Sequence, residues 1–429
     1  MLLDIDRKTA PNAYELEKVD LLKAQKIELE GFQVYVLNGG YEEVCKLELI
    51  YLNGNRTEKQ KLVANACNYL LNSGTSTRSS MEIMEEIDFY GAFYQHENSF
   101  DRSSVSVYTL NKYYKEVFGI LFDVLINPIF PQEELDIYKT NAKQRFLINS
   151  TKNEFLARKA FNYALFGNHP YGYKIQADDF DAINRNDIIE YFENNYRIEQ
   201  ALIVLSGKIT SEILEELKSI LRKYKEQGKY SGNINFDYPE LGEYIPSKYF
   251  EDKQDALQSA IRIGKPTINK LHKDYIELSI VCTILGGYFG SRLMSNIRED
   301  KGYTYGIGAG LYSLLDTGFF YIATEVGSEV CSKALDEIYM EISRLSTELV
   351  PNKELELVKN YLKGAYISGI ENIFSHADKF KGIELYNLNY DYYDRYFELL
   401  NSITSTRIMD LARQYLSVES MSEVVIGKK

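Results

Sequence analysis

Residues 131–139 read PQEELDIYK and residues 351–359 read PNKELELVK, so the pattern Pro-x-x-Glu-Leu-x-x-x-Lys occurs twice in the chain. Both copies are typical of a helix start, with proline in the first turn and glutamate near the positive end of the helix dipole. The same spacing pairs residues 204–208 (VLSGK) with residues 424–428 (VVIGK). Matches at one constant spacing indicate an internal duplication.

Further landmarks repeat at slightly shorter spacings, as loop insertions produce. An apolar helix ending in glycine is predicted at residues 60–74, and its counterpart lies at residues 276–290. Amphipathic helices are predicted at residues 112–125 and 329–345. Each copy therefore combines strand-like runs with a buried helix and trailing amphipathic helices.

This order predicts an α+β fold with two homologous domains, each a mostly antiparallel β-sheet with helices packed on one face. A length of 429 residues also favours more than one domain. We expect the first domain at residues 1–225 and the second at residues 251–429. The linker is placed at residues 226–250, where glycine and proline stand among many charged residues.

The chain is acidic, with 49 Lys and Arg against 62 Asp and Glu and a formal net charge of −13. Phosphate backbones and anionic lipid head groups repel such a chain, so no nucleic-acid or membrane partner is expected. The first residues, MLLDIDR, show no secretory signal, and four cysteines in so long a chain indicate buried thiols rather than a disulfide framework. We expect a cytoplasmic protein.

The sequence offers few catalytic motifs. The four histidines (His96, His169, His272 and His376) are far apart, so no two share a helical face as zinc ligands do. One pair of residues deserves weighing: Arg298 and Tyr305, where a helix end passes into a strand. An arginine there can grip a peptide carboxylate or carbonyl, and a tyrosine hydroxyl can donate to an oxygen that gains negative charge during hydrolysis. The alternative is a surface ion pair of Arg298 with Glu299 beside a packed aromatic ring.

The duplicated layout resembles the pitrilysin/insulinase family of zinc metallopeptidases, in particular its short bacterial and mitochondrial-processing-peptidase-like members. In the first copy, residues 54–58 (GNRTE) and 72–75 (NSGT) are similar to the segments that flank the family's zinc helix, and residues 169–172 (HPYG) to a later turn. In the second copy, residues 285–293 (LGGYFGSRL) and 297–305 (IREDKGYTY) look like the signature of the C-terminal domain.

The resemblance fails at the zinc helix. The family carries His-x-x-Glu-His there, with two zinc-binding histidines, a water-activating glutamate and a further glutamate ligand downstream. The corresponding residues 65–69 read NACNY, and the downstream ligand falls near residues 145–149 (RFLIN), which contain no acidic residue. We therefore expect this chain to bind no cofactor and no catalytic zinc.

Two functions remain open. In the first, the chain is the zinc-less subunit of a heteromeric pitrilysin-type peptidase, and zinc is carried by the partner subunit. The resemblance then implies that Arg298 holds the peptide substrate and that Tyr305 stabilises the reaction at the partner's metal. The alternative is a non-catalytic scaffold or peptide-binding homologue, in which Arg298 and Tyr305 are relics. The identity of the peptide and the choice between homodimer and heterodimer stay undetermined at this stage.

Overall fold

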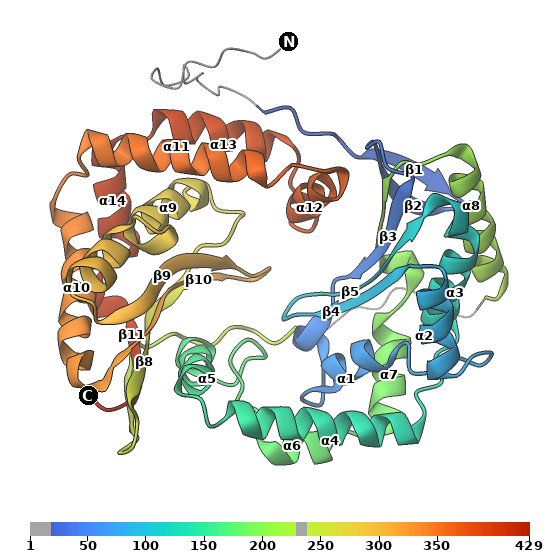
Figure 1. Ribbon diagram of the computed structural model, residues 1–429, viewed down its shortest axis with the longest axis horizontal. Helices are drawn as coiled ribbons and strands as arrows, with labels where there is room; N and C mark the ends of the chain where they lie inside the picture. The colour runs from blue at the N-terminus through green and yellow to red at the C-terminus, as the bar shows by residue number, and fades with distance from the viewer. Residues whose placement is uncertain (1–18, 229–237) are drawn as a thin grey trace, which may run out of the picture.

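The computed structural model describes residues 19–228 and 238–429 of the chain, and within these ranges the strands form two sheets. Figure 1 shows the two halves of the molecule side by side, each with its sheet and covering helices. The predicted α+β class with two similar, mostly antiparallel layers is confirmed. The predicted domain boundaries stay a prediction.

The first sheet has the strand order β1-β2-β6-β3-β5-β4, in which only β2 and β6 run parallel among the described strands. Its strands are β1 (Gln25–Leu29), β2 (Phe32–Asn38), β3 (Val44–Tyr51), β4 (Phe93–Asn98), β5 (Ser103–Leu110) and β6 (Leu202–Gly207). The helices of this half are α1 (Val63–Leu70), α2 (Ser80–Phe89), α3 (Tyr114–Ile126), α4 (Gln132–Asn149), α5 (Asn153–Phe166), α6 (Ala177–Asp181), α7 (Arg185–Asn195) and α8 (Ser211–Glu226).

The second sheet has the order β7-β11-β8-β10-β9, with a parallel pair at β7 and β11. Its strands are β7 (Lys248–Asp252), β8 (Gln258–Thr267), β9 (Thr304–Ser313), β10 (Gly318–Gly327) and β11 (Ser422–Gly427). Its helices are α9 (Tyr275–Cys282), the π-helices η4 (Thr283–Gly287) and η5 (Met294–Asp300), and α10 (Cys331–Thr347), α11 (Asn352–Ser368), α12 (Ile373–Glu384), α13 (Asp391–Ser402) and α14 (Ser405–Tyr415).

Strand alternation divides the apolar residues between two faces of each sheet. In β3, Leu47 and Leu49 belong to the core under the helices of the first half, whereas Ile50 points to the opposite face. In β8, Ile261 and Ile263 likewise face the helices of the second half, and Ala260 faces away. Because both faces are covered, the central strands are buried nearly throughout.

One helix from each half packs on the sheet of the other half. The helix α5, from the first half, packs on β8 and β11 of the second sheet, where Phe161 and Phe166 meet Phe319 at ring-centroid distances of 6.4 and 5.8 Å. The helix α12, from the second half, packs on β2 and β6, where Phe380 meets Tyr35 at 4.8 Å. Figure 1 shows both helices beside the sheet of the opposite half.

A second contact between the halves lies at the tip of the β9–β10 hairpin. There Asp316 pairs with Arg56 at 2.6 Å, and the backbone N–H of Leu315 donates to Asp101 at 2.9 Å. The exchanged helices and the hairpin tip therefore join the halves at separate points. All four cysteines are free and buried. Within the described ranges no helix combines the length and the hydrophobicity that crossing a membrane requires.

Candidate functional site

The helix α1 carries the residues that correspond to the family's zinc motif. Asn65 and Tyr69 stand four residues apart and are both exposed on one face, as the two histidines of such a motif must be. Asn68, at the position of the glutamate, is buried, and its amide donates to the hydroxyl of Tyr196 at 3.0 Å. Asn68 is thus part of the core rather than a group that faces solvent.

Aromatic rings cluster around the outer end of this face. Tyr69, 43% exposed, meets the ring of His96 on β4 at 5.5 Å and the ring of Tyr138 on α4 at 5.0 Å. Burial lowers the pKa of His96, which favours the neutral ring. Tyr138 on α4 thus contacts α1. Residues 145–149, where the family's downstream ligand would fall, lie about two turns further along α4, and Arg145 and Ile148 are exposed there.

This set of side chains does not fit a zinc ion. Zinc in proteins is held by imidazole, thiolate and carboxylate, whereas the exposed face of α1 offers only the amide of Asn65 and the phenol of Tyr69, and the Cys67 thiol is buried in the core. His96 is a lone imidazole whose neighbours are tyrosine rings. In the part of the chain that the structure describes, no three His, Cys, Asp or Glu residues converge on a possible metal position. The site therefore supplies no activated water of its own.

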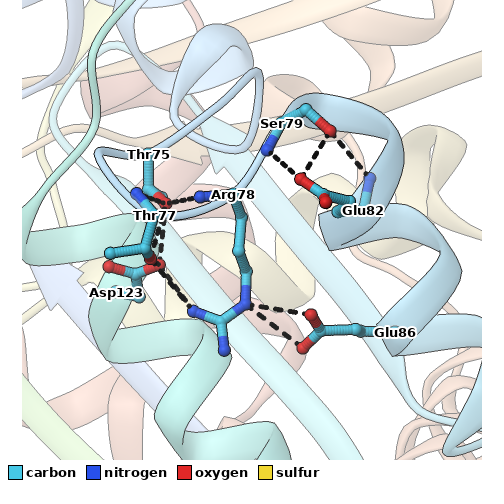
Figure 2. A network of polar contacts seen from close by, with 7 residues as sticks. All are labelled: Thr75, Thr77, Arg78, Ser79, Glu82, Glu86 and Asp123. Carbon is cyan, nitrogen blue, oxygen red and sulfur yellow. Dashed lines mark hydrogen bonds and ion pairs between the residues drawn. The ribbon is translucent and has the colours of Figure 1, made fainter.

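The loop after α1 is fixed to α3 by Asp123 (Figure 2). The carboxylate of Asp123 accepts from the hydroxyls of Thr75 and Thr77 at 2.7 and 2.8 Å and from the guanidinium of Arg78 at 2.7 Å. Arg78 also donates to Glu86 on α2. A hub of charged hydrogen bonds such as this holds the end of α1 against its neighbours.

The next helix starts from the same loop with a capping box. The Ser79 hydroxyl accepts from the backbone N–H of Glu82, and the Glu82 carboxylate accepts from the backbone N–H of Ser79, as Figure 2 shows. This reciprocal pair satisfies two of the N–H groups that every helix start leaves open. The loop after α1 and the start of α2 are thus held by hydrogen bonds, although α1 itself carries none of the residues of the family's zinc motif.

A half-buried glutamate, Glu58, lies shortly before α1, with its carboxylate turned towards the start of that helix. It accepts hydrogen bonds from the backbone N–H groups of Leu62 and Ala64 at 3.2 and 3.0 Å and from the Tyr173 hydroxyl. Burial raises the pKa of Glu58 to about 7, and these hydrogen bonds only partly oppose the rise. Nothing in the flanking segment 54–58 (GNRTE) predicts that the carboxylate of its last residue, Glu58, is enclosed by the fold.

The raised pKa of Glu58 predicts a pH-dependent contribution to stability. A carboxyl that titrates near 4.5 when unfolded and near 7 when folded stabilises the protein fully below pH 4.5 and loses that contribution as the pH rises to about 7. The loss amounts to roughly 3 kcal/mol. Urea unfolding of the wild type and of Glu58→Gln between these pH values should show their free energies of unfolding diverging by that amount.

Glu85→Gln, which changes an exposed carboxyl on α2, is the matched control and should follow the wild type at every pH. Equal pH slopes for the wild type and Glu58→Gln would mean that the pKa of Glu58 is the same in the folded and the unfolded chain.

Arg298 lies in η5, directly before the turn into β9. Gly302, at φ +64°, makes this turn in the left-handed region that favours glycine, and its N–H donates to the Arg298 carbonyl at 3.2 Å. The Arg298 guanidinium lies over the ring of Phe289 at 4.4 Å. It makes no ion pair with Glu299 or with any other carboxylate of residues 19–228 and 238–429. The ion pair of the alternative interpretation is therefore not formed among the described residues.

Tyr305 is the second residue of β9 and is 95% exposed. Its hydroxyl has no hydrogen-bond partner in the described part of the chain, so it is not the packed aromatic of the alternative interpretation. Since η5 packs against β9, Arg298 and Tyr305 stand on adjoining elements. Both are free to meet another molecule.

The surrounding signature residues have structural roles. Gly286 lies so close to β9 that a Cβ there would meet the Ala309 nitrogen at 2.6 Å, which excludes a larger residue. Arg292 is held by Glu354 through two hydrogen bonds of 2.8 and 3.0 Å. His169 is a turn residue, whose ring accepts from the Tyr171 N–H at 3.2 Å. Of the two signature arginines, Arg292 is paired with a carboxylate, whereas Arg298 has none among the residues that the structure describes.

Family models match two consecutive segments of the chain. The model for "Insulinase (Peptidase family M16)" matches residues 34–179, and that for "Peptidase M16 inactive domain" matches residues 182–362. A crystal structure of a peptidase M16 inactive domain from Pseudomonas fluorescens superposes with a TM-score of 0.85 at 22% identity, covering 95% of this chain and 99% of that one.

Two curated relatives match over most of their length. An uncharacterized zinc protease, YmxG of Bacillus subtilis, is 23% identical and covers 84% of this chain and 88% of its own. A protein of Helicobacter pylori named a non-peptidase homolog is 21% identical, covering 88% of this chain and 87% of its own. Together the two family models span most of the residues from 34 to 362. Both models describe domains of one peptidase family, and α1 carries none of the residues of that family's zinc motif. The chain therefore belongs to the insulinase family of peptidases, family M16, as a short two-domain member without the zinc motif.

Proposed function

We propose that the chain is the zinc-less subunit of a heteromeric peptidase of family M16, acting in the cytoplasm on peptides. The observation that carries this proposal is that Arg298 has no carboxylate partner and the Tyr305 hydroxyl has no hydrogen-bond partner within the described chain, although neighbouring signature residues are tied into the fold. A relic arginine on a folded surface readily acquires a carboxylate partner, as most of the other arginines here have done.

The division of labour follows from the chemistry of the two groups. The Arg298 guanidinium offers a planar fork of donors for a backbone carbonyl or a carboxylate of the substrate. The Tyr305 hydroxyl donates a hydrogen bond to the carbonyl oxygen as it becomes negatively charged during hydrolysis. The attacking water and the metal to activate it would have to be supplied by the partner subunit, because the exposed face of α1 offers neither a zinc ligand nor a base.

The surface around Arg298 also fits a protein partner. Phe289 is largely exposed beneath the guanidinium, and exposed aromatic rings with arginine are typical of interface centres. A second function, peptide binding without catalysis, is favoured by the name of the Helicobacter relative, which is a non-peptidase homolog. Zinc measured in the native complex distinguishes the two.

The complex isolated from native cells on a tag attached to this chain should contain about one zinc per copy of the chain and a second family M16 subunit of similar size. The same chain purified alone should contain no stoichiometric zinc, since its donor set does not fit the ion. A native complex without zinc and without such a subunit would contradict the peptidase function and leave the binding function.

A further inference from the structure

A cavity of about 630 Å³ lies between the two halves, on the side of the first sheet that α12 partly covers. Its volume is typical of sites that hold a small ligand or a short peptide segment. Tyrosine rings and charged side chains line it: Tyr108, Tyr275, Tyr312 and Tyr386, the cations Lys46, Arg102, Lys270 and Lys381, and the carboxylates Glu48, Glu97, Asp101 and Asp378.

Half of these cations are already neutralised. The Glu48 carboxylate, which is buried, pairs with Lys46 at 2.8 Å and with Lys381 at 2.7 Å. Lys381 also pairs with Asp378 at 2.7 Å. Asp101 is occupied as well, since it accepts from the Tyr171 hydroxyl and from a backbone N–H at the hairpin tip.

Lys270 has no carboxylate partner among the described residues. Its ammonium donates to the carbonyl of Gly382 at 2.9 Å and lies 5.0 Å from the ring centroid of Tyr386. Burial, together with the positive charges of Arg102 and Lys379, lowers the pKa of Lys270 to about 8. The ammonium thus stands in a partly desolvated place among like charges, an arrangement that an anion would relieve.

Arg102 approaches the same space from the first half, in the turn between β4 and β5. Within residues 19–228 and 238–429 its guanidinium takes part in no ion pair and no side-chain hydrogen bond. A planar fork of donors and an ammonium that line the same cavity, one from each half of the chain, match the two oxygens of a carboxylate. Glu97, also on the wall and without a partner in these ranges, disfavours a polyanion, so a single carboxylate suits the cavity best.

We propose that Lys270 and Arg102 form a carboxylate-binding site, which holds the C-terminal or side-chain carboxylate of a peptide between the two halves of the chain. The surrounding tyrosine rings supply apolar surface and hydroxyl groups for the residues next to that carboxylate. The site uses residues of this chain alone, so it stands whether or not the chain pairs with a zinc-bearing subunit.

Calorimetric titration of the full chain with N-acetyl-tetraalanine and with its C-terminal amide tests the site. The free acid should bind at least about tenfold tighter than the amide, since a charge-assisted contact is lost with the carboxylate. An amidated peptide with one internal aspartate separates the sources: if it binds as well as the free acid, side-chain carboxylates are accepted, and if not, the terminal one is required.

Lys270→Gln and Arg102→Gln should each weaken binding of the free acid about tenfold or more, whereas Lys270→Arg should retain most of it. Lys333→Gln, which removes an exposed cation of α10, is the matched control and should bind like the wild type. If Lys270→Gln does not fold, Arg102→Gln decides, because that side chain holds nothing else in the described chain. Equal affinity for acid and amide, no binding of the acid, or full binding by Arg102→Gln would overturn the site.

Discussion

Tyr305→Phe is expected to lower kcat of the assembled peptidase about 100-fold, with little change in KM. Removing one donor to an oxygen that gains negative charge costs about 10²–10³ in rate in known enzymes. Because Tyr305 is exposed and holds no partner in the described chain, the substitution leaves the fold intact. The measurement is steady-state hydrolysis of a peptide by the complex reconstituted from this chain and the zinc-bearing subunit.

Arg298→Ala is the companion variant and should raise KM, because it removes a charged contact to bound peptide worth about tenfold to hundredfold in affinity. Two matched controls separate these losses from general effects on the surface. Tyr41→Phe changes an equally exposed tyrosine, and Arg158→Ala removes another arginine that lies over a phenylalanine ring. Wild-type turnover in both Tyr305→Phe and Arg298→Ala would leave the two residues without a catalytic role.

Phe380→Ala is expected to destabilise the protein by about 3–5 kcal/mol, the range seen when a buried aromatic ring is deleted. Phe380 is 3% exposed and fills the space between α12 and the first sheet, where it meets Tyr35 and Tyr390. Its loss leaves a cavity at a contact that joins the two halves. Urea unfolding followed by circular dichroism gives the free energy of unfolding.

Phe89→Ala serves as the control for this measurement, since Phe89 is 79% exposed and its removal should cost about 0.5 kcal/mol or less. A loss below about 1 kcal/mol for Phe380→Ala would indicate that α12 docks only loosely on the first sheet.

The duplication made much of the fold predictable. The helices predicted at residues 112–125 and 329–345 are present at Tyr114–Ile126 and Cys331–Thr347, displaced by no more than two residues. Such helices follow from local periodicity, which one stretch of sequence contains in full. The resemblance to family M16 was equally accessible, because its signature residues form continuous segments.

The exchange of α5 and α12 could not be predicted in this way. The apolar stripe of α12 indicates that the helix is half-buried, but not which sheet covers it. The surface that α12 covers includes Leu37, Ile50 and Val204, which lie much earlier in the chain. The strands that carry them show only the ordinary alternation of a half-buried strand. Only contacts between residues remote in sequence decide that choice.

The candidate site was predictable from the sequence only in part. Residues 65–69 reveal the loss of zinc ligands from their chemistry alone, and Arg298 and Tyr305 belong to a continuous signature. That both side chains lack partners is a property of the surface and needs the structure. Glu58 and Lys270 carry no sequence signal, since a single charged residue in a loop is most often solvated.

The helix exchange has a consequence for how the chain is made. As the ribosome releases the first half, the apolar face formed by Leu37, Ile50 and Val204 has no cover, because α12 is translated much later. The first half therefore exposes this apolar face, a kind of surface that favours aggregation, until the second half emerges. In the finished protein, separation of the two halves would expose the apolar sheet face that each exchanged helix covers.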